Sequence, residues 1–155
     1  MPTLNSDEAP RQPAGFLAKF TPQIEARAHA IIVKMRERLP GATMPIYDNY
    51  NALAIGFGPS DRTSDVIFSI AVFPRWVSLF LVGGPQLADP KGLLKGDGST
   101  MRHIVLAGPQ SLDDPDVRAL MDQAEAFAKT PIDPTAPGGM VIKSTSAKQR
   151  PRRPA

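Results

Sequence analysis

Residues 66–82 read VIFSIAVFPRWVSLFLV, and this stretch decides the fold of the chain. Residues 66–72 and 76–82 are apolar runs of strand length, and Phe73-Pro74-Arg75 between them has the composition of a turn. A connection this short joins only antiparallel neighbours, so the sequence predicts a β-hairpin. Because both runs are almost wholly apolar, we expect this hairpin at the buried centre of a sheet.

Further strands are predicted on either side of this hairpin. Residues 47–57 form either one bent strand or two short ones, and Gly58-Pro59-Ser60-Asp61 is a turn. Residues 102–107 are the next strand, and residues 140–142, after Gly138-Gly139, are a candidate edge strand. We therefore expect an antiparallel sheet of about five strands.

Two amphipathic helices are predicted before and after these strands. One starts at Thr21-Pro22 and the other at Asp114-Pro115, each an N-cap followed by proline at the first helical position. Their apolar residues recur at helical spacing: Ile24, Ala28, Ile31, Met35 and Leu39, then Val117, Leu120, Met121, Ala124, Phe127 and Ala128. Both helices must bury their apolar faces, so the fold class is α+β, a two-layer sandwich with an N-terminal and a C-terminal helix flanking the sheet.

The ends of the chain differ in composition from its middle. We expect a disordered arm at 1–14, one α+β domain at 15–130, and a Pro-rich basic tail at 131–155. The formal net charge is +3, but residues 129–155 hold 6 of the 18 Lys and Arg and one of the 15 Asp and Glu. A basic tail attracts nucleic acid or another acidic partner, and a merely solubilising tail is an equal alternative.

Several function classes have no support in the sequence. The chain has no cysteine, which excludes a disulfide scaffold, a Cys-based zinc site and a cysteine nucleophile. It shows no signal-peptide pattern and no apolar run near the roughly 20 residues of a membrane span, so we expect a cytoplasmic protein without membrane contact. No Walker A motif, Ser-His-Asp arrangement or paired-carboxylate motif indicates a cofactor or a catalytic residue.

Three stretches resemble one known family. They are YDNYNAL at 47–53, FPRWVSLF at 73–80, and LLKGDG at 93–98 followed by RHI at 102–104. In their order they resemble the YdhG-like family, domain-of-unknown-function family 1801, over roughly residues 15–130. The resemblance implies an α+β fold with a helix-flanked antiparallel sheet. Some relatives are described as frataxin-like iron chaperones, which implies metal handling as one hypothesis.

Two clusters are candidate sites. The first contains Lys91, Lys95, Arg102 and His103 around Gly96-Asp97-Gly98-Ser99, and Arg75 could join it. Glycine amides and cations suit an anion. An ordinary solvated turn has the same composition. The second cluster is Tyr47, Asn49, Tyr50, Asn51 and Trp76, which could bind a flat ligand or serve only as core and bend residues. No spacing of histidine and carboxylate residues indicates a metal site.

The leading functional hypothesis is a small non-catalytic binding domain that recognises an anionic small molecule or acidic partner. The first alternative is iron or other metal handling, although the first helix offers only Glu25 and Glu37 against Arg27, Lys34, Arg36 and Arg38. The second is weak nucleic-acid association through the tail, and the third is an enzyme without a linear motif. The sequence leaves a monomer and a homodimer equally open.

Overall fold

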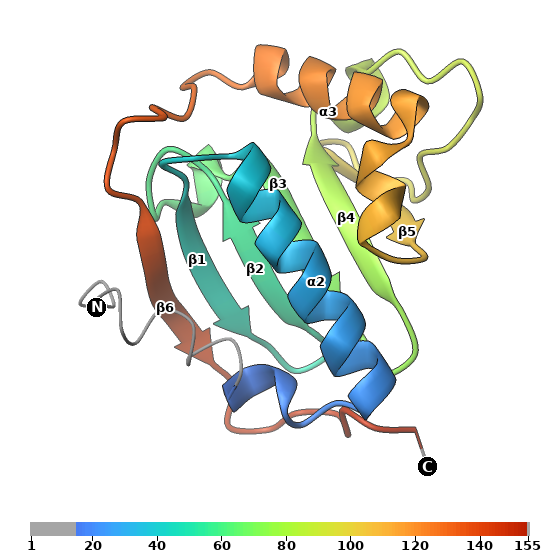
Figure 1. Cartoon of the computed structure of the whole chain (residues 1–155), viewed down its shortest axis with the longest axis vertical. Helices are drawn as coiled ribbons and strands as arrows, with labels where there is room; N and C mark the ends of the chain where they lie inside the picture. The colour runs from blue at the N-terminus through green and yellow to red at the C-terminus, as the bar shows by residue number, and fades with distance from the viewer. Residues whose placement is uncertain (1–14, 155) are drawn as a thin grey trace.

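The computed structural model describes residues 15–154 and confirms an α+β fold (Figure 1). The predicted arm, residues 1–14, lies outside the described residues. The long helices are α2 (Pro22–Arg38) and α3 (Pro115–Phe127), and residues 15–17 are also helical. The strands are β1 (Thr43–Asp48), β2 (Leu53–Phe57), β3 (Phe68–Val72), β4 (Val77–Val82), β5 (Met101–Leu106) and β6 (Gly139–Thr145). Short 3-10 helices are η1 (Thr63–Asp65), η2 (Gly84–Gln86) and η3 (Pro109–Asp113).

The strands form one sheet in the order β5-β4-β3-β2-β1-β6. Residues 15–154 form six strands where about five were expected, and the expectation that all are antiparallel is wrong, because β6 pairs with β1 in parallel. The four pairs formed by strands consecutive in the chain, from β1 and β2 to β4 and β5, are antiparallel. β6 arrives only after α3 and residues 128–138, a return long enough to run parallel to β1.

The predicted hairpin is confirmed as β3 and β4. Ile70 lies opposite Leu79, and Val72 lies opposite Val77, all four fully buried. Both strands are interior in the strand order, as their apolar sequences predict. The hairpin therefore holds residues 73–76 at one end of the sheet, and this end carries the site described below.

Both predicted helix starts are confirmed. The Thr21 hydroxyl accepts the Ile24 amide at 3.4 Å, and the Asp114 carboxylate accepts the Asp116 amide at 2.8 Å. Each cap satisfies an amide that has no partner within the helix. The helices are also joined by ion pairs, since Arg38 in the last turn of α2 contacts Asp122 of α3 at 2.7 Å.

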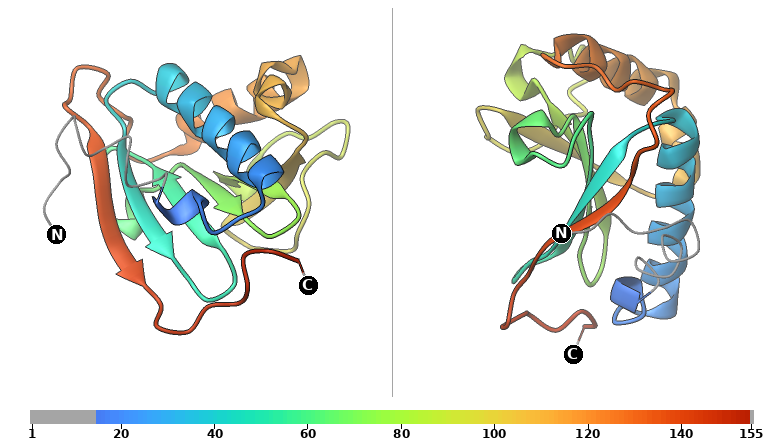
Figure 2. Two further views of the ribbon diagram at one scale, coloured as in Figure 1. Left: turned by 60° about the horizontal axis from the view of Figure 1, so that its bottom comes forward. Right: turned by 90° about the vertical axis from the view of Figure 1, so that its left-hand side faces the viewer.

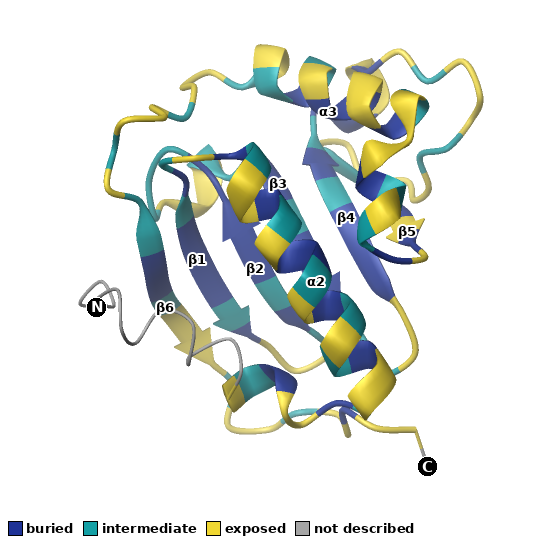
Figure 3. Ribbon diagram, in the orientation of Figure 1, coloured by how far each residue is buried: buried dark blue, intermediate teal, exposed yellow. Residues whose placement is uncertain are grey.

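One face of the sheet carries the core. Ile46, Ile55, Ile70 and Leu79 lie opposite one another across β1 to β4, and all are fully buried. α2 lies across this face and buries its apolar side on it, while α3 contacts β4 (Figures 1 and 3). Because side chains alternate along each strand, the residues between these core positions point to the other face.

The opposite face, called here the open face, has no described α-helix over it (Figure 2). Its side chains fall into rows set by the strand register. The rows that concern β2 to β5 are Ala54, Ala71, Ser78 and Val105, then Gly56, Ser69, Phe80 and His103. Many of these residues are small, whereas the core face carries large aliphatic side chains.

Candidate ligand-binding groove

The tip of the β3–β4 hairpin presents two stacked aromatic rings. The Phe73 amide donates to the Trp76 carbonyl at 2.9 Å, which leaves Pro74 and Arg75 at the turn. The two ring centroids are 4.6 Å apart and the ring planes differ by 17°. Because Val77 faces the core, its neighbour Trp76 projects on the side of the open face. Trp76 is 40% exposed, so the stack leaves aromatic surface for a ligand.

The basic tail folds back across the same end of the sheet. After β6, the Ser146 amide donates to the Asp48 carbonyl at 2.9 Å, and the Arg150 amide donates to the Tyr50 carbonyl at 2.8 Å. The Arg150 guanidinium also lies over the Tyr50 ring, 5.6 Å from its centroid, in a cation–π contact. Residues 146–154 thus follow the tip of the β1–β2 hairpin and end beside Trp76.

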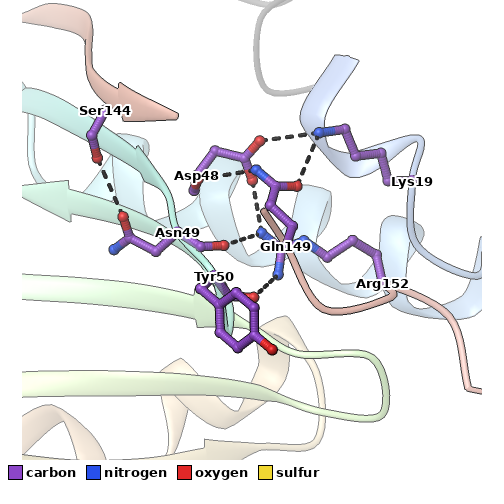
Figure 4. Close-up of polar contacts among 7 residues, drawn as sticks. All are labelled: Lys19, Asp48, Asn49, Tyr50, Ser144, Gln149 and Arg152. Carbon is purple, nitrogen blue, oxygen red and sulfur yellow. Dashed lines mark hydrogen bonds and ion pairs between the residues drawn. The ribbon is translucent and has the colours of Figure 1, made fainter. Parts of the chain in front are cut away.

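A buried ion pair anchors this segment (Figure 4). Arg152 donates to the Asp48 carboxylate at 2.9 Å; Arg152 is 5% exposed and Asp48 is 1% exposed. Arg152 also donates to the carbonyl oxygens of Asn49 at 2.5 Å and Tyr50 at 3.4 Å. On the other side of the carboxylate, the Lys19 ammonium donates to Asp48 at 3.1 Å.

Charge and burial act in opposite directions on this carboxyl. Burial acts to raise the pKa of Asp48, but polar contacts with Gln149, Lys19 and Arg152 outweigh it and hold the pKa below its ordinary value. Asp48 is therefore an anion in the folded chain at neutral pH. A buried carboxylate without its cations is strongly unfavourable, so the Asp48–Arg152 contact favours the docked position of the tail.

A groove of about 730 Å³ opens between the hairpin tips and the anchored tail. Its described lining residues are Asn51, Phe73, Pro74, Arg75, Trp76, Arg150, Pro151, Arg153 and Pro154. Three of these nine are arginines and none is acidic, so the groove has a positive potential. Its volume lies within the roughly 300–1,000 Å³ typical of small-molecule sites.

The five residues of the predicted anion cluster do not all come together. Arg75 is at the hairpin tip, whereas Arg102 pairs with Leu81 near the other end of β4. At about 3.3 Å per residue, this places the two some 20 Å apart along the strand. Arg102 and His103 are consecutive in β5, so their side chains project from opposite faces of the sheet.

The loop also pairs its own polar groups. Lys91 donates to the Asp116 carboxylate at 2.8 Å, and this contact raises the pKa of Lys91. The Asp89 carboxylate accepts the amides of Leu93 and Leu94 at 2.9 and 2.8 Å. A carboxylate of the chain itself thus occupies Lys91, one of the cations that were expected to meet an anion.

The remaining polar groups of the loop form hydrogen bonds with β5. Lys95 and His103 exchange backbone hydrogen bonds of 2.8 and 3.1 Å, and Arg102 donates to the Gly98 carbonyl at 3.2 Å. Of the five predicted residues, only Arg75 reaches the groove.

The predicted aromatic and amide cluster divides in two. Tyr47 is hydrogen-bonded to the Thr63 hydroxyl at 2.7 Å, and the Asn49 side chain accepts from Ser144 at 3.2 Å, so both have structural partners. Asn51 and Trp76 line the groove. Tyr50 lies beside it under Arg150, so one residue of the first predicted cluster and three of the second meet at this end of the sheet.

Sequence reasoning gave the basic tail a role in nucleic-acid binding, but it did not join Arg150, Arg152 and Arg153 to Asp48 in one site. Asp48 carries the signal that could have found them: it comes two residues after Ile46, and alternation therefore places its carboxylate on the core face. A buried carboxylate needs a cation, and the tail is the most basic segment of the chain. The partner itself could not be read from the sequence, because it lies 104 residues away.

Neither a metal site nor a membrane span is seen in the described part of the chain. Among residues 15–154, no three His, Asp or Glu side chains lie close enough together to hold a metal ion. No described helix is long and apolar enough to cross a membrane. Comparison with protein-family models, curated proteins and solved structures found no match, so the resemblance to the YdhG-like family stays a prediction.

Proposed function

We propose that this chain is a binding domain whose groove takes a phosphate-bearing ligand with a flat ring, the chemistry of a nucleotide. The observation that carries this proposal is that Arg75, Arg150 and Arg153 line one groove together with the exposed, stacked Trp76. The proposal keeps the predicted recognition of an anion and moves it from the glycine loop to the groove. It also gives the basic tail a place in the site.

The chemistry of the lining supports both halves of such a ligand. A guanidinium matches a phosphate with two parallel hydrogen bonds, which makes arginine the residue suited to planar phosphate recognition. A base stacked on an aromatic side chain is worth about 1–3 kcal/mol. The groove is also preformed, because the buried Asp48–Arg152 pair fixes the tail before a ligand arrives.

The lining favours binding over catalysis. Its nine described residues comprise asparagine, arginine, proline, phenylalanine and tryptophan, and none of these is a usual nucleophile or general acid or base at neutral pH. Arginine in particular stays protonated. A ligand held here meets positive charge and an aromatic ring, which fix its position without a group to attack it.

Trp76 is the single tryptophan of the chain, so its fluorescence reports this groove directly. We expect AMP to quench that fluorescence in a saturable manner, and adenosine or inorganic phosphate alone to bind more weakly. Arg75→Ala and Arg153→Ala should each weaken AMP binding about tenfold or more, the loss of a charged hydrogen bond of about 1.5 kcal/mol.

Arg36→Ala is the matched control. It removes the same charge from an exposed position in the last turn of α2, at the other end of the molecule from the tail (Figure 1). AMP affinity should be unchanged in this variant. Fluorescence that does not respond to millimolar AMP, or an equal loss in Arg36→Ala and Arg75→Ala, would refute the proposed function.

A further inference from the structure

The open face continues from the groove along β4. Trp76, Ser78 and Phe80 alternate with the buried Val77, Leu79 and Leu81, so the first three all project on the open face. Phe80 lies opposite His103 of β5, and the two ring centroids are 4.9 Å apart with a 30° tilt. This face therefore has a second aromatic pair besides Phe73 and Trp76.

The register row between the two aromatic pairs is that of Ser78. Ser78 lies between Ala71 and Val105 in its register row, and Val105 is 46% exposed. Ser78 is buried, and its hydroxyl has no hydrogen-bond partner among the residues described. The line along β4 from Trp76 to Phe80, called here the path, thus crosses the small side chains of Ala71 and Ser78.

The length of this path corresponds to a few nucleotides. Trp76 and Phe80 are four residues apart, which is about 13 Å at 3.3 Å per residue. A stacked nucleic-acid strand rises 3.4 Å per nucleotide, so about four nucleotides cover this distance. Aromatic surfaces at such a spacing can stack unpaired bases, but they cannot reach bases inside a duplex.

Charge along the path is uneven. Arg75, Arg150 and Arg153 lie at the Trp76 end. At the other end, Lys95 is exposed and paired in register with His103, but Asp97 is exposed in the same loop. We therefore expect the groove to hold phosphate and the Phe80–His103 pair to act mainly by stacking.

From this arrangement we infer that the ligand is a single-stranded nucleic acid, with one base on Trp76 and a later base on the Phe80–His103 pair. This inference rests on the proposed function, because the groove would hold one end of the strand. It adds that affinity depends on the length of the strand and on residues far from the groove.

The test uses the full chain with thymidine monophosphate and with oligothymidylates of two to six nucleotides. Trp76 fluorescence reports the groove, and anisotropy of end-labelled oligonucleotides reports the whole strand. We expect the affinity to rise at least tenfold from one nucleotide to about four and then to level off. Duplex DNA of the same length should bind more weakly than the single strand.

His103→Ala separates the two parts of the site. It should weaken binding of a six-nucleotide strand about fivefold or more and leave binding of the monophosphate unchanged, because one stacked base is lost. Phe80→Leu keeps the apolar volume but removes the ring, and it should have the same effect. Lys95→Gln should reduce the slope of log K against log salt by up to about 0.7, the value for one phosphate contact on a single strand.

Affinity that is independent of length, or oligonucleotide binding unchanged in both His103→Ala and Phe80→Leu, would overturn the inference. If the monophosphate still quenches Trp76 in that case, the proposed function stands. If neither the monophosphate nor any oligonucleotide binds, both fail. Equal binding of heparin and of the oligonucleotide would also overturn the inference, because stacking would then play no part.

Discussion

Replacing Arg152 with alanine tests whether the buried ion pair holds the tail and so forms one wall of the groove. The substitution leaves the Asp48 carboxylate, 1% exposed, with Lys19 as its remaining cation. Loss of one partner of a buried pair costs about 3–5 kcal/mol. Lys19 still contacts Asp48 at 3.1 Å, so we expect the lower end of that range.

The cost falls on docking of the tail rather than on the whole fold. When residues 146–154 leave the sheet, water reaches Asp48 and the penalty disappears, so the open form becomes more populated. A change of about 3 kcal/mol raises the ratio of open to docked molecules more than about a hundredfold. The rise ends once most molecules are open.

Limited proteolysis with trypsin measures this opening. Lys148 is exposed and is followed by Gln149, so it is cleavable, whereas prolines follow Arg150 and Arg153 and block cleavage there. When opening is fast, the rate of cleavage follows the population of the open form. We expect cleavage after Lys148, followed by mass spectrometry, to be about a hundredfold faster in Arg152→Ala than in the parent chain.

Arg153→Ala provides the comparison, because it removes the same charge from the next residue. Arg153 is exposed, and within the described part of the chain its side chain donates to the Lys19 and Ala18 carbonyls alone, at 3.3 and 3.4 Å. Its loss should change cleavage only a few-fold. Equal cleavage rates in the two variants would refute the idea that the Asp48–Arg152 pair anchors the tail.

Two further predictions concern the fold. The pKa of Asp48 is lowered in the folded state, so its charge stabilises the fold above the unfolded pKa of about 4, and this contribution is lost as pH falls through the folded value. Asp48→Asn should therefore be less stable than the parent at pH 7 by urea unfolding, and the difference should shrink below about pH 4; a constant difference would contradict this. Asp114→Ala removes the cap of α3 and should lower the free energy of unfolding by about 1 kcal/mol, while Asp113→Ala, one residue outside the cap, should cost less.

Local pattern was enough to predict most of the fold. The hairpin of β3 and β4 and both helix starts depend on residues close together in the chain, so apolar spacing and capping chemistry predict them. The position of β6 depends on contact with β1, which is distant in sequence. Its short apolar core, Met140 and Val141, suggests a strand, but no local feature says that it pairs in parallel.

The candidate site was predicted less well for the same reason. Composition drew attention to the glycine loop because its cations are close together in sequence, but Asp89 and Asp116 already pair with the loop. Arg75 and Trp76 were identified, each in a different cluster. Both residues lie at the end of the sheet where the β3–β4 hairpin turns and where the tail folds across it. Their proximity to the tail follows from the topology of the sheet.

This geometry also decides how the role of the tail has to be tested. Deleting residues 140–155 would remove Met140 and Val141, which are 1% and 4% exposed in the sheet, together with the arginines of the groove. Loss of binding after such a deletion would follow from damage to the core as readily as from loss of the site. The paired substitution of Arg150 and Arg153 by glutamine leaves β6 and the Asp48–Arg152 pair in place. It therefore separates the charge of the tail from its contribution to the fold, which the deletion cannot do.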